Sequence, residues 1–191
     1  MAIKRLHYFN GQFLKEQDFT DEQKYHLDMR RRLNQRLHAP GIVFGLDVIP
    51  GANKVTVQPG MAIDAQGREI VLDTATDLTI TAAADITIAY NEEQTDESSE
   101  TGIVGRKRWT ESVVLANAAD PDGIVLAKVA TVSPVALNAA FRRPYASPVV
   151  LGDLEVGRNL TIQGNLTVQG ETTTVQTERT RGNVVLGDDS R

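Results

Sequence analysis

The sequence predicts a mainly β protein with an N-terminal helix, a β-sandwich or barrel-like body, and a C-terminal stem in which three copies of the chain intertwine as a β-helix. Three observations support this fold class. Apolar residues recur at helical spacing before residue 40, short β-prone runs alternate with turn residues over 41–140, and a six-residue repeat begins after residue 151.

The composition excludes several functional classes. With 20 Lys and Arg against 25 Asp and Glu, the net charge of -5 argues against binding nucleic acid or an anionic membrane surface. The absence of cysteine excludes disulfides, thiolate metal sites and thiol catalysis. No segment approaches the ~20 apolar residues of a membrane span, and the N-terminus lacks the apolar run of a signal peptide. We therefore expect assembly in the cytoplasm without direct membrane insertion.

One helix is predicted near the N-terminus. Thr20-Asp21-Glu22-Gln23 has the pattern of a capping box, which starts a helix. Tyr25, Met29, Leu33 and Leu37 then form one apolar stripe, and Ala39-Pro40-Gly41 ends it. Other faces of this helix carry basic residues, namely Lys24, Arg30, Arg31, Arg32 and Arg36. This basic cluster is either a solvated face or a surface that docks on an acidic neighbour.

The following segment has the pattern of a β-sandwich or small barrel. Its predicted strands, in order, are 42–49, 54–58, 61–65, 69–72, 78–81, 86–90, 112–117 and 123–132. Asp120-Pro121-Asp122-Gly123 supplies the turn of the last hairpin.

Two segments interrupt this β pattern. Residues 91–100 are polar and acidic, with no apolar anchor, and predict a mobile loop. The basic segment Arg106-Lys107-Arg108-Trp109 follows. Its side chains could form ion pairs with the acidic residues of 91–100 or with another subunit. Residues 141–148 contain two prolines and predict an extended linker. The expected organisation is therefore a docking segment and helix (1–40), a body (41–140), a linker (141–150) and a stem (151–191).

The six-residue repeat predicts the trimeric stem. Leu154, Leu160 and Leu166 align in successive units, as do Val156, Ile162 and Val168, and these residues are the predicted trimer core. Ordering six backbone residues costs on the order of 6–12 kcal/mol. Burying one Leu and one Val or Ile returns on the order of 3–6 kcal/mol. Three units are too few for a single-chain stack, so three chains are expected to share one core.

Several segments resemble proteins of phage tails and contractile injection systems. Tyr8 to Phe19, with Gln23 and Tyr25 after it, resembles the N-terminal segment of baseplate and receptor-binding tail proteins, including a type VI secretion baseplate subunit. Segments 41–48 and 57–70 are similar to a pattern common in tail-fibre and baseplate proteins. Residues 152–174 resemble the stem repeats of tail fibres and spikes.

This resemblance implies a structural, non-enzymatic component of a phage-tail-like particle, as a virion or injection-system component. The chain would form a homotrimer, attach to other baseplate or fibre subunits through its N-terminal region, and project its stem as a tail fibre. The residues expected to dock on the baseplate are Phe9, Gly11, Phe13, Leu14, Gln17, Phe19, Tyr25, Arg30, Arg31 and Arg32. The alternative is a receptor- or glycan-binding fibre module that uses Trp109, Tyr90 or Tyr145.

No pattern in the sequence indicates catalysis or a bound cofactor. The histidines His7, His26 and His38 lack metal-ligand spacing, and no phosphate-binding loop or nucleophile motif is present. A third and weaker alternative is a glycan hydrolase or calcium site built from Asp64, Asp73 and Asp77, which would require these carboxylates to cluster. We therefore expect no enzyme activity, no cofactor and no metal.

Overall fold

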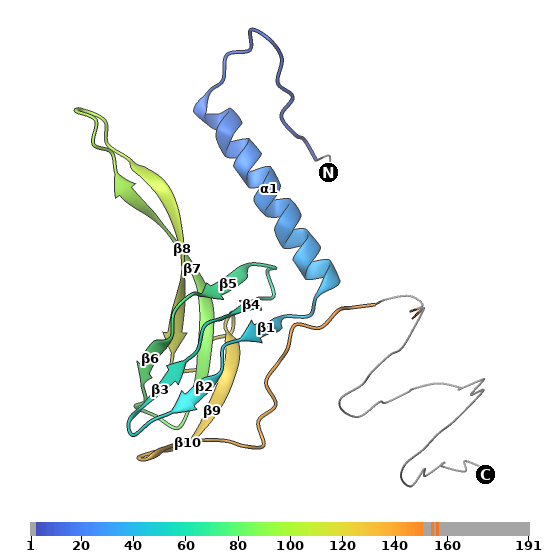
Figure 1. Cartoon of the computed structure of the whole chain (residues 1–191). Coiled ribbons are helices and arrows are strands. Elements are labelled where there is room, and N and C mark those ends of the chain that lie inside the picture. The colour runs from blue at the N-terminus through green and yellow to red at the C-terminus, as the bar shows by residue number, and fades with distance from the viewer. Residues whose placement is uncertain (1–2, 151–153, 155, 157–191) are drawn as a thin grey trace, which may run out of the picture. The chain divides into compact units, whose positions relative to one another are not determined.

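Ten strands and one helix make up the part of the chain that the computed structural model describes, residues 3–150, 154 and 156 (Figure 1). The elements in chain order are α1 (Glu16–Leu37), β1 (Gly41–Gly45), β2 (Val48–Pro50), β3 (Lys54–Val57), β4 (Gly60–Ile63), β5 (Glu69–Leu72), β6 (Thr76–Thr79), β7 (Asp85–Glu97), β8 (Arg106–Ala116), β9 (Ile124–Val132) and β10 (Val135–Leu137). The mainly β prediction with one N-terminal helix is confirmed for these residues.

Three antiparallel sheets share one core. Their strand orders are β1-β4-β5, β2-β3-β6 and β10-β9-β7-β8. Fully buried aliphatic side chains from all three sheets meet in this core, among them Ile42, Val55, Ile88 and Leu126. Successive side chains of a strand point to opposite faces of the sheet, so every second residue faces the core. This explains why apolar residues recur at every second position in the sequence.

The first predicted strand is two strands. Residues 42–49 were expected to run continuously, but β1 ends at Gly45 and β2 begins at Val48. Gly45 and Leu46 have φ angles of 63° and 55°, so the backbone turns there. The turn lets β1 pair with β4 in one sheet and β2 pair with β3 in another.

The predicted helix start is wrong. Helix α1 begins at Glu16, and the Asp18 carboxylate accepts the Lys15 backbone N–H at 2.8 Å. Asp18 therefore satisfies a free backbone donor before the predicted capping box. Thr20 lies inside the helix, where its hydroxyl donates to the Glu16 carbonyl at 3.1 Å.

The predicted mobile loop at 91–100 is also wrong. Most of it belongs to β7, which pairs with β8 from Thr87↔Ala116 as far as Glu97↔Arg106. This polar segment forms a strand without apolar side chains because the hydrogen bonds to β8 are made by backbone N–H and C=O groups. Figure 1 shows the two strands projecting beyond the rest of the body.

The Pro-containing segment 141–150 lies along the body. Its backbone is hydrogen-bonded to β1. The Ile42 N–H donates to the Pro144 carbonyl and the Ala146 N–H donates to the Ile42 carbonyl, each at 2.8 Å. The Arg143 guanidinium pairs with Asp47 at 2.5 Å and donates to the Leu46 carbonyl at 2.7 Å. The chain divides into two compact units after Gly152, so this segment belongs to the first.

The predicted stem falls almost entirely outside the described residues. Leu154 and Val156 are described and are exposed in the single chain, whereas Leu160, Ile162, Leu166 and Val168 lie outside. The trimer core stays a prediction. Among the described residues, no helix is both long and apolar enough to cross a bilayer.

Candidate docking surface

A turn folds the N-terminal segment toward helix α1. The Gln12 backbone N–H donates to the Phe9 carbonyl at 3.2 Å, and Gly11 occupies a φ of 84° that favours glycine. The Tyr8 hydroxyl donates to the Glu22 carboxylate, and this hydrogen bond raises the pKa of Tyr8. The segment before the helix is therefore tied to the helix surface at a defined point.

The aromatic side chains of this region point to solvent. Phe13 is 89% exposed, Phe9 is 63% exposed and Phe19 is 52% exposed. Burying a Phe side chain is worth roughly 1.5–3 kcal/mol, so three exposed rings within eleven residues of sequence are a cost in the single chain. These three residues, close together in the sequence, are called the aromatic cluster below. We take it as a candidate interaction site, because exposed apolar side chains that gather on a surface often mark one.

A groove of about 820 Å³ lies between the N-terminal segment and α1. Ile3, Leu6 and Met29 contribute apolar surface to it, and basic side chains such as Arg5 and Arg32 line it as well. Arg32 is the one predicted docking arginine that lines this groove.

Helix α1 is joined to the body by polar contacts in its C-terminal half. Arg30 pairs with Glu69 at 3.4 Å, and the Asn34 amide donates to the Gly67 carbonyl at 3.0 Å. The Gln35 amide donates to the Ala65 carbonyl at 3.3 Å. No residue of α1 is buried, and Leu33 and Leu37 of its apolar stripe are exposed. Leu33 and Leu37 therefore lie on a helix face that the described body does not cover, whereas Tyr25 and Met29 are half-buried and line the groove.

Tyr90 on β7 is the centre of this attachment. Two guanidinium groups lie over its ring, with Arg68 Cζ 4.9 Å and Arg31 Cζ 5.8 Å from the ring centroid. Arg31 also pairs with Glu92 at 3.9 Å. Arg68 is held in place by the buried Asp64 carboxylate, which accepts its Nε–H at 2.6 Å and two turn backbone N–H groups at 2.9 Å. Cation–π contacts of this kind are worth about 0.5–2 kcal/mol each.

Burial raises the pKa of Tyr90 to about 12, with the nearby carboxylates of Glu111 and Glu92 adding to the effect and Arg31 opposing it. The folded protein thus keeps a proton that the unfolded chain releases near pH 10. Because the unfolded state binds fewer protons in this range, the free energy of unfolding should fall as the pH rises from about 10 to about 12.

We expect Tyr90→Phe to flatten this fall in the free energy of unfolding, while the phenyl ring keeps its contacts with Arg31 and Arg68. Urea unfolding at several pH values between 9 and about 12 measures it. Tyr145→Phe, at an exposed tyrosine, serves as the control and should retain the slope. An unchanged slope in the Tyr90 variant would contradict the assignment.

The structure separates the predicted docking residues into two groups. Arg30 and Arg31 form ion pairs with Glu69 and Glu92 of the same chain. For these two arginines, the acidic partner predicted for the basic cluster lies in the protein's own body. Phe9, Phe13 and Phe19 are exposed around the start of α1, with Leu14 half-buried between them. Gln17 donates to Asp21 at 2.6 Å, and the Tyr25 ring meets His26 edge-on at 5.3 Å.

The residues of the alternative functions are not brought together. Tyr90 contacts Arg31 and Arg68, whereas Trp109 lies exposed on β8 and Tyr145 lies in the segment after β10. Asp64 is bound to Arg68, and Asp77 is bound to Lys54 and Thr56. Within the described residues, no group of three or more His, Asp or Glu side chains is arranged to hold a metal ion.

Sequence reasoning missed the attachment through Tyr90 and Arg68. Residues 64–68 read Asp-Ala-Gln-Gly-Arg. An Asp shortly before a Gly is typical of a turn in which the Asp carboxylate accepts backbone N–H groups two or more residues later. The signal predicts the turn. Contact between the turn and α1 is long-range and has no local pattern.

Comparisons with known proteins give matches among solved structures only. No protein-family model matches the chain, and no curated protein matches it. The crystal structure of TssK matches 75% of this chain and 42% of that chain, at 13% sequence identity and a TM-score of 0.48. The chain thus spans less than half the length of that protein. A similarity at this level carries no argument about function.

Proposed function

We propose that this chain is a structural component of a phage-tail-like contractile particle, which attaches to the baseplate through its N-terminal region and projects a trimeric fibre stem. The observation that carries the proposal is the exposed aromatic cluster of Phe9, Phe13 and Phe19. These residues lie in the segment whose sequence resembles baseplate proteins, and the turn and the Tyr8–Glu22 hydrogen bond hold that segment against α1.

The form of helix α1 supports an attachment role. Only its C-terminal half contacts the body through the polar groups described above, so its N-terminal half carries the aromatic cluster away from the core. Figure 1 shows this end of α1 lying beyond the short strands β1 to β6, on the side to which the β7–β8 hairpin also projects. A projecting, aromatic-rich helix end is suited to insert into a pocket of a partner subunit, where aromatic anchors dominate binding energy.

The proposal is tested by incorporation into particles. The triple variant Phe9→Ala, Phe13→Ala, Phe19→Ala should be recovered in purified particles at a level lower by about tenfold or more, since each lost anchor costs on the order of 1 kcal/mol or more. Quantitative mass spectrometry of particles from a strain lacking the wild-type gene measures this loss.

The control is a double variant, Phe44→Ala with Tyr145→Ala, which removes exposed aromatics from the body and should be incorporated normally. Circular dichroism establishes that both variants are folded, and native mass measurement checks the stoichiometry, for which we expect three copies. Normal incorporation of the triple variant would overturn the docking role.

A further inference from the structure

The outer part of the β7–β8 hairpin, residues 91–112 and called the arm below, has two open edges. Strand β9 pairs with β7 only from Asp85 to Ile88, and β8 is the last strand of its sheet. Beyond these pairs, no strand of the described chain pairs with the outer edge of either strand of the arm. Open edges of this kind are templates for pairing with another strand.

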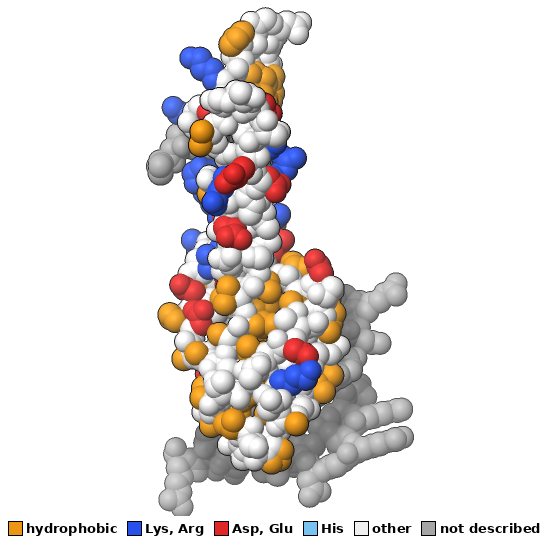
Figure 2. Space-filling view, turned by 90° about the vertical axis from the view of Figure 1, so that its left-hand side faces the viewer, with side chains coloured by type: hydrophobic (Ala, Val, Ile, Leu, Met, Phe, Trp, Pro, Cys, Tyr) orange, Lys and Arg blue, Asp and Glu red, His pale blue; other side chains and the backbone are white. Residues whose placement is uncertain are grey.

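The two edges carry opposite charge. The β7 side contains Glu92, Glu93, Asp96 and Glu97 with no basic residue, and the β8 side contains Arg106, Lys107 and Arg108 with one acid, Glu111. In Figure 2 most of the basic and acidic side chains in view lie on the upper, projecting part, which also carries apolar side chains near its end. The arm is therefore a ribbon with an acidic edge and a basic edge.

These charges are not neutralised inside the described part of the chain. Over residues 3–150, no ion pair joins the two strands of the arm, and the one arm carboxylate in an ion pair is that of Glu92, with Arg31. Arg106 instead donates to the Gln94 carbonyl at 2.6 Å. All seven residues from Arg106 to Ser112 are exposed.

We infer that the arm is a self-association element, in which the basic β8 edge of one copy pairs with the acidic β7 edge of the next. β7 and β8 are antiparallel within the chain, so a neighbouring β7 can lie antiparallel to β8 when both arms point the same way. Such a head-to-tail contact, repeated by rotation about an axis along the arms, gives a ring when the rotation closes. Pairing of two β8 edges would instead place basic groups side by side, which is unfavourable.

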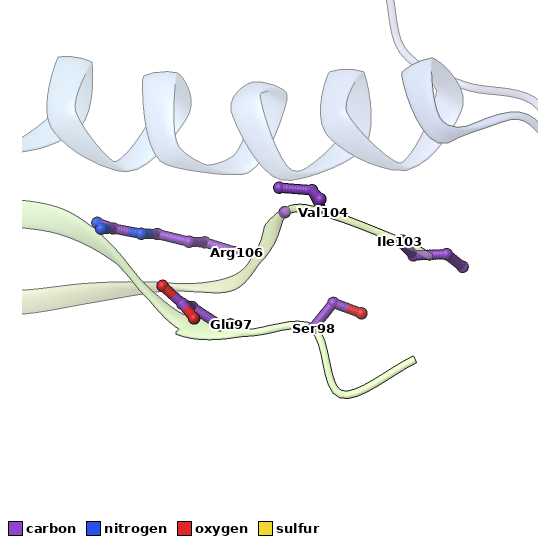
Figure 3. Close-up of a pocket in the computed structure, with 6 residues that line it drawn as sticks. Glu97, Ser98, Ile103, Val104 and Arg106 are labelled. Carbon is purple, nitrogen blue, oxygen red and sulfur yellow. The ribbon is translucent and has the colours of Figure 1, made fainter. Parts of the chain in front are cut away.

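The arm tip fits the same arrangement. Ile103 and Val104 are exposed between the two strands, and Figure 3 shows Glu97 and Arg106 where the strands end, with Val104 beyond them. Arms that point the same way bring the apolar tips of all copies to one end of the ring, where they can shield one another from water. This inference goes beyond the proposed function, because it requires neither the stem nor a baseplate.

The chain has no cysteine, which permits a direct test on the full-length protein. Thr95→Cys on β7 and Thr110→Cys on β8 are made as separate single variants, carry different affinity tags and are co-expressed. A short bis-maleimide should then join the introduced β7 thiol of one copy to the introduced β8 thiol of another, whereas each variant alone should give little cross-linked product. Equal linkage between like positions would overturn the head-to-tail arrangement.

Charge reversal separates pairing of edges from chance proximity. Changing Arg106, Lys107 and Arg108 to Glu should abolish the mixed cross-link, and adding Glu93→Lys, Asp96→Lys and Glu97→Lys should restore it, because the edges are again complementary. The inference would be overturned if the charge-swapped protein is folded but does not form the cross-link. It would also be overturned if the original pair of variants forms no cross-link, since the edges would then be occupied by another protein or by solvent.

The outcome is independent of the docking test. Cross-linking is measured on the purified chain, and incorporation into particles is measured with an intact arm and altered N-terminal aromatics. Loss of one result with retention of the other shows which of the two proposals has failed.

Discussion

Replacing Gly60 with alanine is expected to lower the free energy of unfolding by about 3 kcal/mol, since overpacking against rigid backbone costs that much. A Cβ at this position would lie 2.4 Å from the Leu46 nitrogen and 2.5 Å from the Phe44 oxygen. Both atoms belong to the corner where β1 passes into β2, and neither is a flexible side-chain end. The alanine therefore forces β4 away from that corner and opens the core beside Leu46.

Thermal unfolding followed by circular dichroism measures this effect, and a loss of 3 kcal/mol corresponds to a fall in Tm of about 6–12 °C for a chain of this size. Gly105→Ala is the matched control, because a Cβ there meets nothing within 4 Å. We expect the control to stay within about 0.5 kcal/mol of the wild type. If the Gly60 variant has the same Tm as the control, the backbone at the corner between β1 and β2 can move to accommodate the added methyl group.

Replacing Gly67 with alanine is expected to detach helix α1 from the body. The Cβ would lie 2.1 Å from the Arg31 carbonyl oxygen, and the φ of 75° adds strain of roughly 1–2 kcal/mol for an L-residue. Because the helix touches the body mainly through Arg30, Arg31, Asn34 and Gln35, a shift at this contact loosens the whole attachment. Hydrogen exchange in α1 should become faster, and trypsin should cut sooner after Arg30 to Arg32.

Gly102→Ala separates the two causes. Gly102 has a similar φ of 81°, but a Cβ there meets nothing within 4 Å. This variant should show the conformational strain alone, without faster exchange or cleavage in α1. Equal protection of α1 in the Gly67 and Gly102 variants would mean that the close approach of the turn to the helix does not hold the helix in place.

The sequence was sufficient for the elements whose signals are local. Period two predicted most strands of the body, and β5 has the bounds that the pattern indicated, 69–72. The apolar stripe predicted a helix through Leu37. The same stripe did not show which face contacts the body, because that contact is made by polar side chains whose partners lie on β5, β7 and the turn before β5.

For the candidate docking surface, the sequence alone determined which residues are available: a Phe-rich segment before a basic helix, and an acidic stretch followed by a basic one. Tertiary structure decided what those residues do. In the folded chain, Arg30 and Arg31 form ion pairs with Glu69 and Glu92, and Phe9, Phe13 and Phe19 remain exposed. The acidic stretch forms one strand of the projecting β7–β8 hairpin. The physical reason is that hydrogen-bond ladders and ion pairs join residues far apart in the chain, and no local pattern specifies such partners.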